Sequence, residues 1–281
     1  MRLLRTTGVR PIAAKSYRWL QPFKLLEPKA GSKVVAALAL RLESFTRLSS
    51  DDRAAVERLS RVSRIIPARR DLIREGENPK YVHLMVDGWA CRYKTLPDGR
   101  RQVVAFALPG DFCDLNVYVL KAMDHSVGAV TRLSVADIAR EEMDELTSRR
   151  PRVAQAIWWE SLVNNAIQRE WTLNLGQRTA YERIGHLLAE IYLRLRTIGM
   201  TQGDCCDFPL TQIDLAEAAG LTSVHVNRML QELRHDGLIS LERKRLRIPD
   251  IRKLMEASLF NPNYLHLEHE GRELDARLEP A

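Results

Sequence analysis

The sequence predicts an α+β protein of two domains: an N-terminal antiparallel sheet closed into a barrel or roll, connecting helices, and a C-terminal domain that ends in a β-hairpin. Between residues 65 and 139 the hydrophobic residues alternate with a period of two, which is typical of half-buried strands. From Met143 onward the spacing becomes helical. A chain of 281 residues also exceeds the roughly 150 residues expected of one domain.

The composition is that of a folded protein with a basic surface. Hydrophobic residues make up 45% of the chain and charged residues 28%, which is ordinary for a globular protein. The net charge of +7 favours a polyanionic partner, because Lys and Arg release counterions when they meet phosphates. The basic residues are dense in one C-terminal stretch, which contains Arg228, Arg234, Arg243, Lys244, Arg245, Arg247, Arg252 and Lys253.

Neither a membrane segment nor a metal site is expected from the sequence. It contains no run of about 18 apolar residues, and the first forty residues lack the apolar core of a secretory signal. The four cysteines form no Cys-x-x-Cys pair, and no histidine completes a zinc spacing. We therefore expect a cytoplasmic protein without a structural metal.

Four consecutive segments are predicted along the chain. Residues 1–38 carry eight Lys or Arg against a single acid, so we expect a basic, irregular extension there. The sheet domain is expected over residues 39–142, preceded at its start by two short helices, and the connecting helices over residues 143–199. The C-terminal domain and its tail then occupy residues 200–281.

Asp-Gly turns separate the predicted strands. Tyr81–Val86 and Trp89–Tyr93 are separated by Asp87-Gly88, and Pro97-Asp98-Gly99 leads to the next run, Val103–Leu108. Both central residues of a type I′ turn need positive φ, which Asp-Gly supplies, so each turn predicts a hairpin. The region is therefore expected to be a compact antiparallel sheet.

The connecting region predicts two long helices. The first follows Pro151, a favourable first-turn residue, and continues to Leu175 without an internal Gly or Pro. A long helix between two domains is a common place for subunits to meet, so we expect a homodimer joined through it. Glu160 and Asn164 interrupt a simple coiled-coil seam, however, and packing within one chain explains the same apolar residues.

Residues 210–230 predict a helix-turn-helix. Thr211 can cap the first helix, with Asp214 in its first turn, and Ile213, Leu215 and Ala216 are expected to face inward. Gly220 supplies the positive φ of the turn, and Thr222 can cap the second helix. The inner face of that helix is Val226, Leu230 and Leu233, and its outer face is Ser223, Val224, His225, Asn227 and Arg228.

A basic hairpin follows the two helices. Leu238–Leu241 and Leu246–Ile248 are short apolar segments, and between them lie Arg243, Lys244 and Arg245. Such a hairpin is the wing of a winged helix domain. A helix pair followed by a basic wing is far more specific for DNA binding than the helix pair alone, because helical hairpins are common in proteins that never meet DNA.

At these residues the chain resembles the Crp/Fnr superfamily of bacterial transcription regulators. LTQIDLAEAAGLTSVHVNRMLQELRHDGLI resembles its C-terminal DNA-binding motif, and IREGENPKYVHLMVDGWACRYKTLPDGRRQVVAFALPGDF resembles its N-terminal β-roll. The resemblance covers about residues 40 to 265. It implies a jelly-roll type, cyclic-nucleotide-binding-like sensor domain, a long dimerisation helix and a winged helix-turn-helix. It further implies a homodimer that binds a palindromic site on double-stranded DNA and works with RNA polymerase.

The sensor domain departs from the members that bind cyclic AMP. Those carry Gly-Glu for the ribose and later Arg-Ser for the cyclic phosphate, where this chain has Asp114-Leu115 and His125-Ser126. Leu115 cannot accept a hydrogen bond, and His125 offers no bidentate fork for a phosphate. We therefore expect no cyclic-AMP site. No closely spaced N-terminal cysteines are present either, so no iron-sulfur cluster is expected.

The recognition helix departs from the best-known members as well. They present an acidic residue where this chain has Val224, which suits a thymine methyl better than an amino group. Arg228 matches the arginine of the family and can pair with guanine O6 and N7, while Asn227 can read adenine. His225 can contact either a phosphate or a base.

Other interpretations remain open at two places. The adjacent Cys205 and Cys206 are expected in a polar loop ahead of the DNA-binding helices, where oxidation would disturb DNA binding, so a redox switch is one interpretation. The roll could instead be a ligand- or protein-binding module whose DNA affinity is secondary and non-specific. An enzyme is not expected, because no nucleophile elbow, phosphate-binding loop or metal signature is present.

Overall fold

A computed structural model of the chain describes residues 37–115 and 119–267. The predicted basic extension therefore lies outside the described residues, apart from its last two positions, which begin helix α1 (Ala37–Glu43). The acidic end of the chain after Leu267 lies outside them as well.

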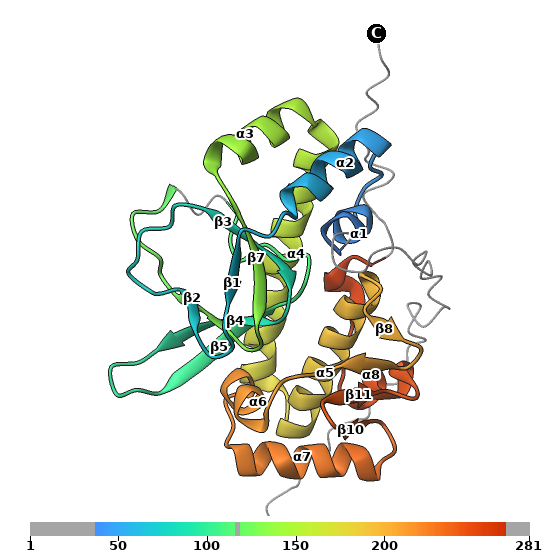
Figure 1. The fold of residues 1–281 in the computed structure, drawn as a ribbon. Helices are drawn as coiled ribbons and strands as arrows, with labels where there is room; N and C mark the ends of the chain where they lie inside the picture. Colours follow the sequence, from blue (N-terminus) through green and yellow to red (C-terminus); the bar gives the residue numbers. More distant parts are fainter. Residues whose placement is uncertain (1–36, 116–118, 268–281) are drawn as a thin grey trace, which may run out of the picture.

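The N-terminal domain is an antiparallel roll of two sheets, as predicted (Figure 1). Helices α1 and α2 (Ser50–Leu59) precede it. One sheet has the order β1-β7-β3 and the other β2-β6-β4-β5, with every pairing antiparallel. The strands are β1 Arg64–Ile66, β2 Asp71–Ile73, β3 Val82–Asp87, β4 Ala90–Thr95, β5 Arg101–Ala107, β6 Ser126–Ala129 and β7 Leu133–Ile138.

The two Asp-Gly turns have different roles, and one prediction was wrong. The turn at Pro97-Asp98-Gly99 joins β4 to β5 in a hairpin, as expected. At Asp87-Gly88, however, β3 pairs with β7 and β4 pairs with β5 and β6, so no hairpin forms. The chain instead crosses from one sheet to the other. Gly88 is required there because its φ is +88° and a Cβ would lie 2.2 Å from the carbonyl oxygen of Arg132.

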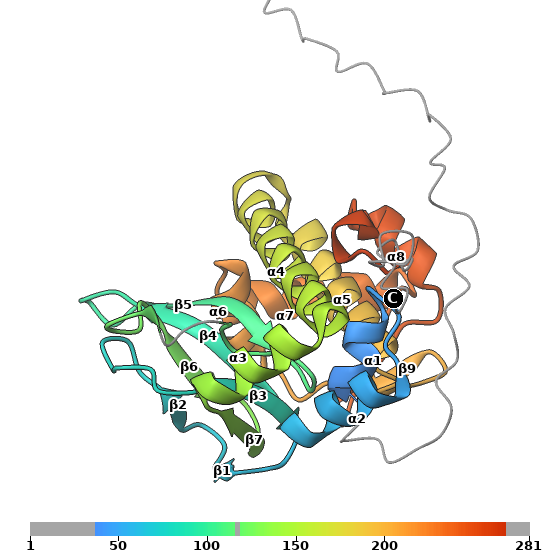
Figure 2. The ribbon, with the colours of Figure 1, turned by 90° about the horizontal axis from the view of Figure 1, so that it is seen from above.

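Three helices connect the roll to the C-terminal domain: α3 Arg140–Arg149, α4 Pro151–Gln177 and α5 Ala180–Thr197. Pro151 begins α4, and Thr179 caps α5 in a capping box with Glu182. Figure 2 shows α4 and α5 side by side, with the sheets of the roll on one side and α8 on the other. None of the helices in the described part of the chain has the length and apolar character needed to cross a membrane.

The C-terminal domain is a winged helix-turn-helix, as predicted. It consists of β8 Thr201–Gln202, β9 Cys205–Asp207, α6 Gln212–Ala219, α7 Ser223–His235, β10 Ser240–Glu242, β11 Arg245–Arg247 and α8 Ile251–Ala257. The four strands form one sheet in the order β10-β11-β9-β8. A final 3-10 helix, η3 (Pro262–Leu265), returns to pack on α4.

Two apolar cores hold these parts together. One fills the roll, and the other extends from the outer surface of β4 and β5 through α4 and α5 into the C-terminal domain. In the second core the ring of Phe106 meets Trp171 edge-on at 5.9 Å, and Trp89 meets Phe208 edge-on at 6.0 Å. The roll is thus packed against both the connecting helices and the DNA-binding domain.

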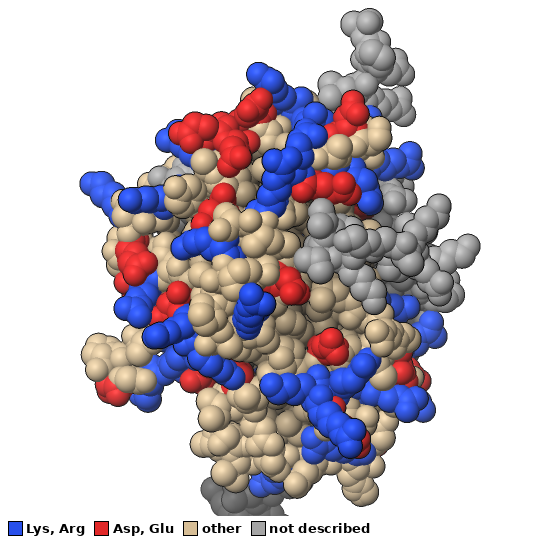
Figure 3. Space-filling view, in the orientation of Figure 1, with Lys and Arg blue, Asp and Glu red and all other residues tan. Residues whose placement is uncertain are grey.

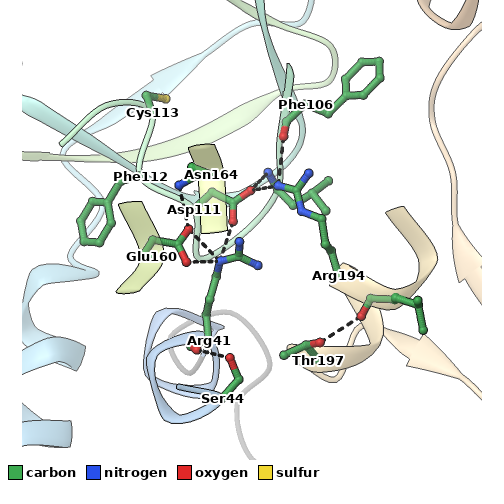
Figure 4. A network of polar contacts seen from close by, with 12 residues as sticks. Arg41, Ser44, Phe106, Asp111, Phe112, Cys113, Glu160, Asn164, Arg194 and Thr197 are labelled. Atoms are coloured by element: carbon green, nitrogen blue, oxygen red, sulfur yellow. Dashed lines mark hydrogen bonds and ion pairs between the residues drawn. The ribbon is translucent and has the colours of Figure 1, made fainter. Parts of the chain in front are cut away.

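A buried ionic cluster, which we call the Asp111 cluster, joins the roll to the helices around it (Figure 4). Asp111 follows β5, and its carboxylate lies 3.0 Å from Nε of Arg41 on α1 and 2.5 Å from Nη2 of Arg194 on α5. Arg41 also contacts Glu160 on α4 at 3.0 Å. All four side chains are almost fully buried. Burial would raise the pKa of Asp111, but the two arginines outweigh it and hold the pKa below its usual value.

Removal of the central carboxylate should therefore destabilise the fold severely. Asp111→Ala leaves Arg41 and Arg194 buried without their shared partner, and we expect the free energy of unfolding to fall by about 3 to 5 kcal/mol. Urea denaturation measures it. The matched control is Asp98→Ala, which removes an exposed ion pair with Arg100 and should cost no more than about 0.5 kcal/mol. A loss below about 1 kcal/mol at Asp111 would contradict this account of the cluster.

Candidate DNA-binding surface

Helices α6 and α7 begin and end as their sequence dictates. Thr211 caps α6, and its backbone N–H and hydroxyl both donate to Asp214, at 2.8 and 2.7 Å. Gly220 ends α6 with a φ of +63°, which confirms the predicted turn. The Thr222 hydroxyl caps α7 by accepting from the N–H of His225 at 3.2 Å. These caps fix where the second helix starts.

Helix α7 has a buried face and an open face. The predicted inner residues Val226, Leu230 and Leu233 are fully buried. On the other face Val224 is 79% exposed, and the side chain of Arg228 is 67% exposed. Among the described residues, Arg228 has polar contacts with its helical neighbours, at 3.3 Å between its Nη2 and Nε2 of His225 and 3.8 Å between its Nε and Oε1 of Glu232. The open face of α7 thus presents a methyl-bearing side chain and a guanidinium side by side, both free to meet a partner.

The exposed part of α7 also includes the other predicted residues of its outer face. Ser223, His225 and Asn227 are half-buried, and Ser223 and His225 flank Val224 on either side of the helix. The prediction that Ile213 faces inward was wrong, because Ile213 is 62% exposed. Leu215, Ala216 and Ala219 form the inner face of α6, and a residue two positions before Leu215 lies on the opposite side of a helix.

The wing is a tight hairpin that carries its cations at the tip. Ser240–Glu242 pairs with Arg245–Arg247, and the two residues between the strands, Arg243 and Lys244, both have positive φ, of +48° and +62°. Such angles normally favour Gly or Asn, so charge rather than turn propensity explains these residues. Arg245 lies in β11, where its Nη2 donates to Gln202 at 3.0 Å. Lys and Arg side chains gather in this lower part of the molecule (Figure 3).

The adjacent cysteines do not lie in a polar loop, which corrects that expectation. Cys205 and Cys206 belong to strand β9, in which successive side chains point to opposite faces. Cys206 is buried, and burial raises its pKa to about 12, whereas Cys205 is half-exposed. A redox switch at this pair stays a prediction, and both the strand geometry and the raised pKa disfavour a reactive thiolate there.

Comparisons with known proteins agree with this architecture. Residues 182–257 match the Crp-like helix-turn-helix domain, and residues 64–150 match the cyclic nucleotide-binding domain. The transcriptional activator protein FnrL of Cereibacter sphaeroides is 33% identical over 75% of this chain and 85% of its own length. The transcriptional activatory protein AadR of Rhodopseudomonas palustris is 31% identical over 76% and 85%. The chain belongs to the Crp/Fnr family.

Solved structures of the family share the fold. The structure of FixK2 from Bradyrhizobium japonicum is similar with a TM-score of 0.62 and 25% identity, over 69% of this chain and 95% of that one. TTHB099, a regulator from Thermus thermophilus, is similar with a TM-score of 0.55 and 20% identity over 69% and 96%. With its Crp-type helix-turn-helix, this Crp/Fnr protein is a sequence-specific DNA-binding regulator.

The residues at the positions of the predicted nucleotide contacts make contacts within the roll. His125 lies between two carboxylates, with Nε2 3.1 Å from Asp114 and Nδ1 2.8 Å from Asp124. Both contacts are hydrogen bonds only when the ring carries two protons. Ser126 accepts from the backbone N–H of Glu75 at 2.9 Å. Leu115 packs against the core of the roll. These residues do not fit a cyclic phosphate or a ribose.

Sequence reasoning missed Arg92 at this place. Its guanidinium donates to the carbonyl oxygens of Phe112 and Cys113 and lies 3.9 Å from Asp114. Arg92 lies in strand β4, and its side chain is mostly buried. It binds backbone carbonyl groups of the roll and does not form an open anion-binding site. Among the described residues no group of three or more His, Cys, Asp or Glu could hold a metal ion.

The contacts of His125 with the carboxylates of Asp114 and Asp124 should make the stability of the roll depend on pH. Burial lowers the pKa of His125, but hydrogen bonds to Asp114 and Asp124 outweigh it and raise the pKa above the ordinary value of about 6.5. A raised histidine pKa stabilises the fold fully below about pH 6.5, and the stabilisation is lost as the pH rises through the folded-state value.

We therefore expect His125→Gln to lower the free energy of unfolding more at about pH 6 than at about pH 9. Urea denaturation of both proteins at the two pH values measures the difference. An equal loss at both pH values would show that the ring is not held as an imidazolium.

Proposed function

We propose that the protein acts as a homodimer on a palindromic operator, which it reads with α7 and contacts through phosphates with the wing. The observation that carries this proposal is the open face of α7, where Val224 and Arg228 are exposed beside a wing whose tip is cationic. A helix of this kind enters the major groove with its N-terminal residues against the base edges. Because the proposed target is DNA, we place the protein in the cytoplasm.

Three side chains on α7 have the chemistry to read bases. Arg228 offers a bidentate fork to guanine O6 and N7, and Asn227 offers the amide pattern that matches adenine. Val224 has no polar atom, and its two methyl groups suit the thymine methyl. The operator should therefore contain a thymine at the position that faces Val224.

The other exposed polar groups are suited to the DNA backbone. Thr211 and Thr222 stand at the N-termini of α6 and α7, where the backbone N–H groups and the helix dipole favour a phosphate. The remaining phosphate contacts are assigned to Ser223, His225, Arg243, Lys244 and Arg245. Such contacts set affinity and register without reading sequence.

An apolar stripe on α4 is the proposed dimer interface. Trp158 is 70% exposed, Leu162 is 61% exposed, and Leu173 is exposed too. The spacings of four and eleven residues place all three on one side of the helix. Isolated exposed apolar residues are normal, but three aligned on one long helix indicate a covered surface. The two-fold axis of a dimer through α4 would relate the two α7 helices.

The roll of this protein is proposed to work without cyclic nucleotide or an iron-sulfur cluster. The positions that would hold the nucleotide are occupied by the contacts of His125, Ser126 and Leu115 described above. We further propose the domain division of residues 39–142, 143–199 and 200–281, with the roll as the regulatory part. Since FnrL and AadR are named activators, activation through RNA polymerase is the proposed mode of regulation.

Loss of the arginine on α7 should weaken specific binding. Arg228→Ala is expected to cost about 1 to 3 kcal/mol on the operator and to relax discrimination at one base pair of each half-site. The control is Arg252→Ala, which removes an exposed arginine on α8, away from α7. Fluorescence anisotropy with operator and mutated-operator DNA measures both. If Arg228→Ala binds like the parent, α7 is not the reading helix.

A charge in the stripe on α4 should separate the subunits. Leu162→Glu places a carboxylate in the proposed apolar interface, where its desolvation is unfavourable. We expect the protein to become a monomer in sedimentation and to lose operator binding, while exposed Leu175→Glu, on another side of α4, should leave the oligomeric state unchanged. A dimeric Leu162→Glu protein would place the interface elsewhere.

A further inference from the structure

The roll contacts the first helix of the helix-turn-helix directly. Arg69, in the connection between β1 and β2, forms a bidentate pair with Asp214 on α6, with 2.7 Å between Nη1 and Oδ1 and 3.1 Å between Nη2 and Oδ2. Arg69 holds a φ of +63°, an uncommon angle for a residue with a side chain. The backbone of the roll is thus bent at the residue that reaches α6.

A second arginine contacts α6 one turn further along. Nη1 of Arg101, at the start of β5, lies 2.7 Å from Oε2 of Glu217. Its guanidinium is held in place from the other side by the ring of Tyr93, 3.8 Å from the ring centroid, and by the Sγ of Cys91 at 3.1 Å. Next to it, Gln102 donates to the carbonyl oxygen of Ala218 at 3.3 Å.

These contacts, which we call the roll–α6 contact, combine a half-exposed Arg69 on a buried Asp214 with a partly buried Arg101–Glu217 pair. Asp214 is 2% exposed, and the same carboxylate also accepts from Thr211, so both of its oxygens are committed. The guanidinium of Arg101 stacks on Tyr93 as well as meeting Glu217, and a stacked arginine loses less entropy in an ion pair than a free one. The pairs therefore define one relative orientation of the two surfaces.

Helix α6 is also held from its other side. Nη1 of Arg183 on α5 donates to the carbonyl oxygen of Ala219 at 2.6 Å, and the side chain of Leu175 on α4 lies so near Gly220 that a Cβ there would be 3.3 Å from it. Helix α6 packs on α7, so whatever fixes α6 also fixes α7. Figure 1 shows α6 between the β4–β5 hairpin and the connecting helices, with α7 below α6 on the side away from the roll.

We propose that Arg69 and Arg101 are positioning residues for operator binding. They touch no DNA, and they hold α6, and through it α7, in one orientation relative to the roll and α4. A dimer must place two α7 helices about 34 to 36 Å apart in successive turns of the major groove, so a fixed orientation sets the half-site spacing. This inference rests on the proposed dimeric function, and it gives the roll a task that requires no small ligand.

The test exchanges the charges of one pair. Arg101→Glu places two carboxylates against each other and should weaken operator binding about tenfold, because the competent orientation becomes a fraction of the population. Glu217→Arg should have a similar effect, and the double variant should recover most of the affinity. Arg100→Glu makes the same charge change in the same hairpin without touching α6, since Arg100 pairs with Asp98, and should bind like the parent.

Half-site spacing separates positioning from a general loss of stability. The parent should discriminate strongly between its operator and versions with one base pair added or removed at the centre, Arg101→Glu should discriminate less, and the double variant should discriminate as the parent does. A destabilised fold would lose affinity for all three DNAs equally, and circular dichroism melting identifies such a variant.

The outcomes are separate for the two proposals. If the parent binds no palindromic DNA, the proposed function fails. If the parent binds but Arg101→Glu keeps its affinity and its spacing preference, only the positioning role is overturned. If Arg101→Glu and Arg100→Glu both weaken binding and Glu217→Arg tightens it, the arginines act by direct attraction to DNA and the positioning role is again overturned.

Discussion

The carboxylate of Asp111 between Arg41 and Arg194 is the interaction on which the arrangement of the molecule depends. It brings one turn of the roll, α1 and α5 to the same buried point, and Glu160 adds α4 through Arg41. A buried charge needs its partners in place, because desolvation exceeds what a poorly placed ion pair returns. The roll and the connecting helices are therefore fixed relative to each other before any DNA is met.

Helix α5 connects the Asp111 cluster to the DNA-binding surface. Helix α5 holds Asp111 through Arg194 near its C-terminal end, and α7 and α8 pack along it. The winged helix domain is thus attached to α5 on one side and to Arg69 and Arg101 of the roll on the other. His125 and Ser126 make hydrogen bonds within the roll, and the role proposed for the roll is that of a scaffold that sets the direction of α7.

Local features were predictable from the sequence, and features that join distant segments were not. The caps at Thr211 and Thr222, the positive φ of Gly220 and the buried side of α7 follow from periodicity and capping rules within a few residues. The Asp87-Gly88 turn was misassigned because its glycine serves a crossing between two sheets. Arg69 and Asp214 are separated by 145 residues, and nothing near either of them indicates the other.

The measurement that tests the account most directly is selection of bound sequences from a random DNA pool by the purified full-length chain without added nucleotide. The account predicts enrichment of one palindrome whose half-sites lie about one helical turn apart, with a thymine opposite Val224, and no change when cyclic AMP is added. Binding that is blind to sequence and falls steeply with salt, or enrichment that requires cyclic AMP, would contradict it.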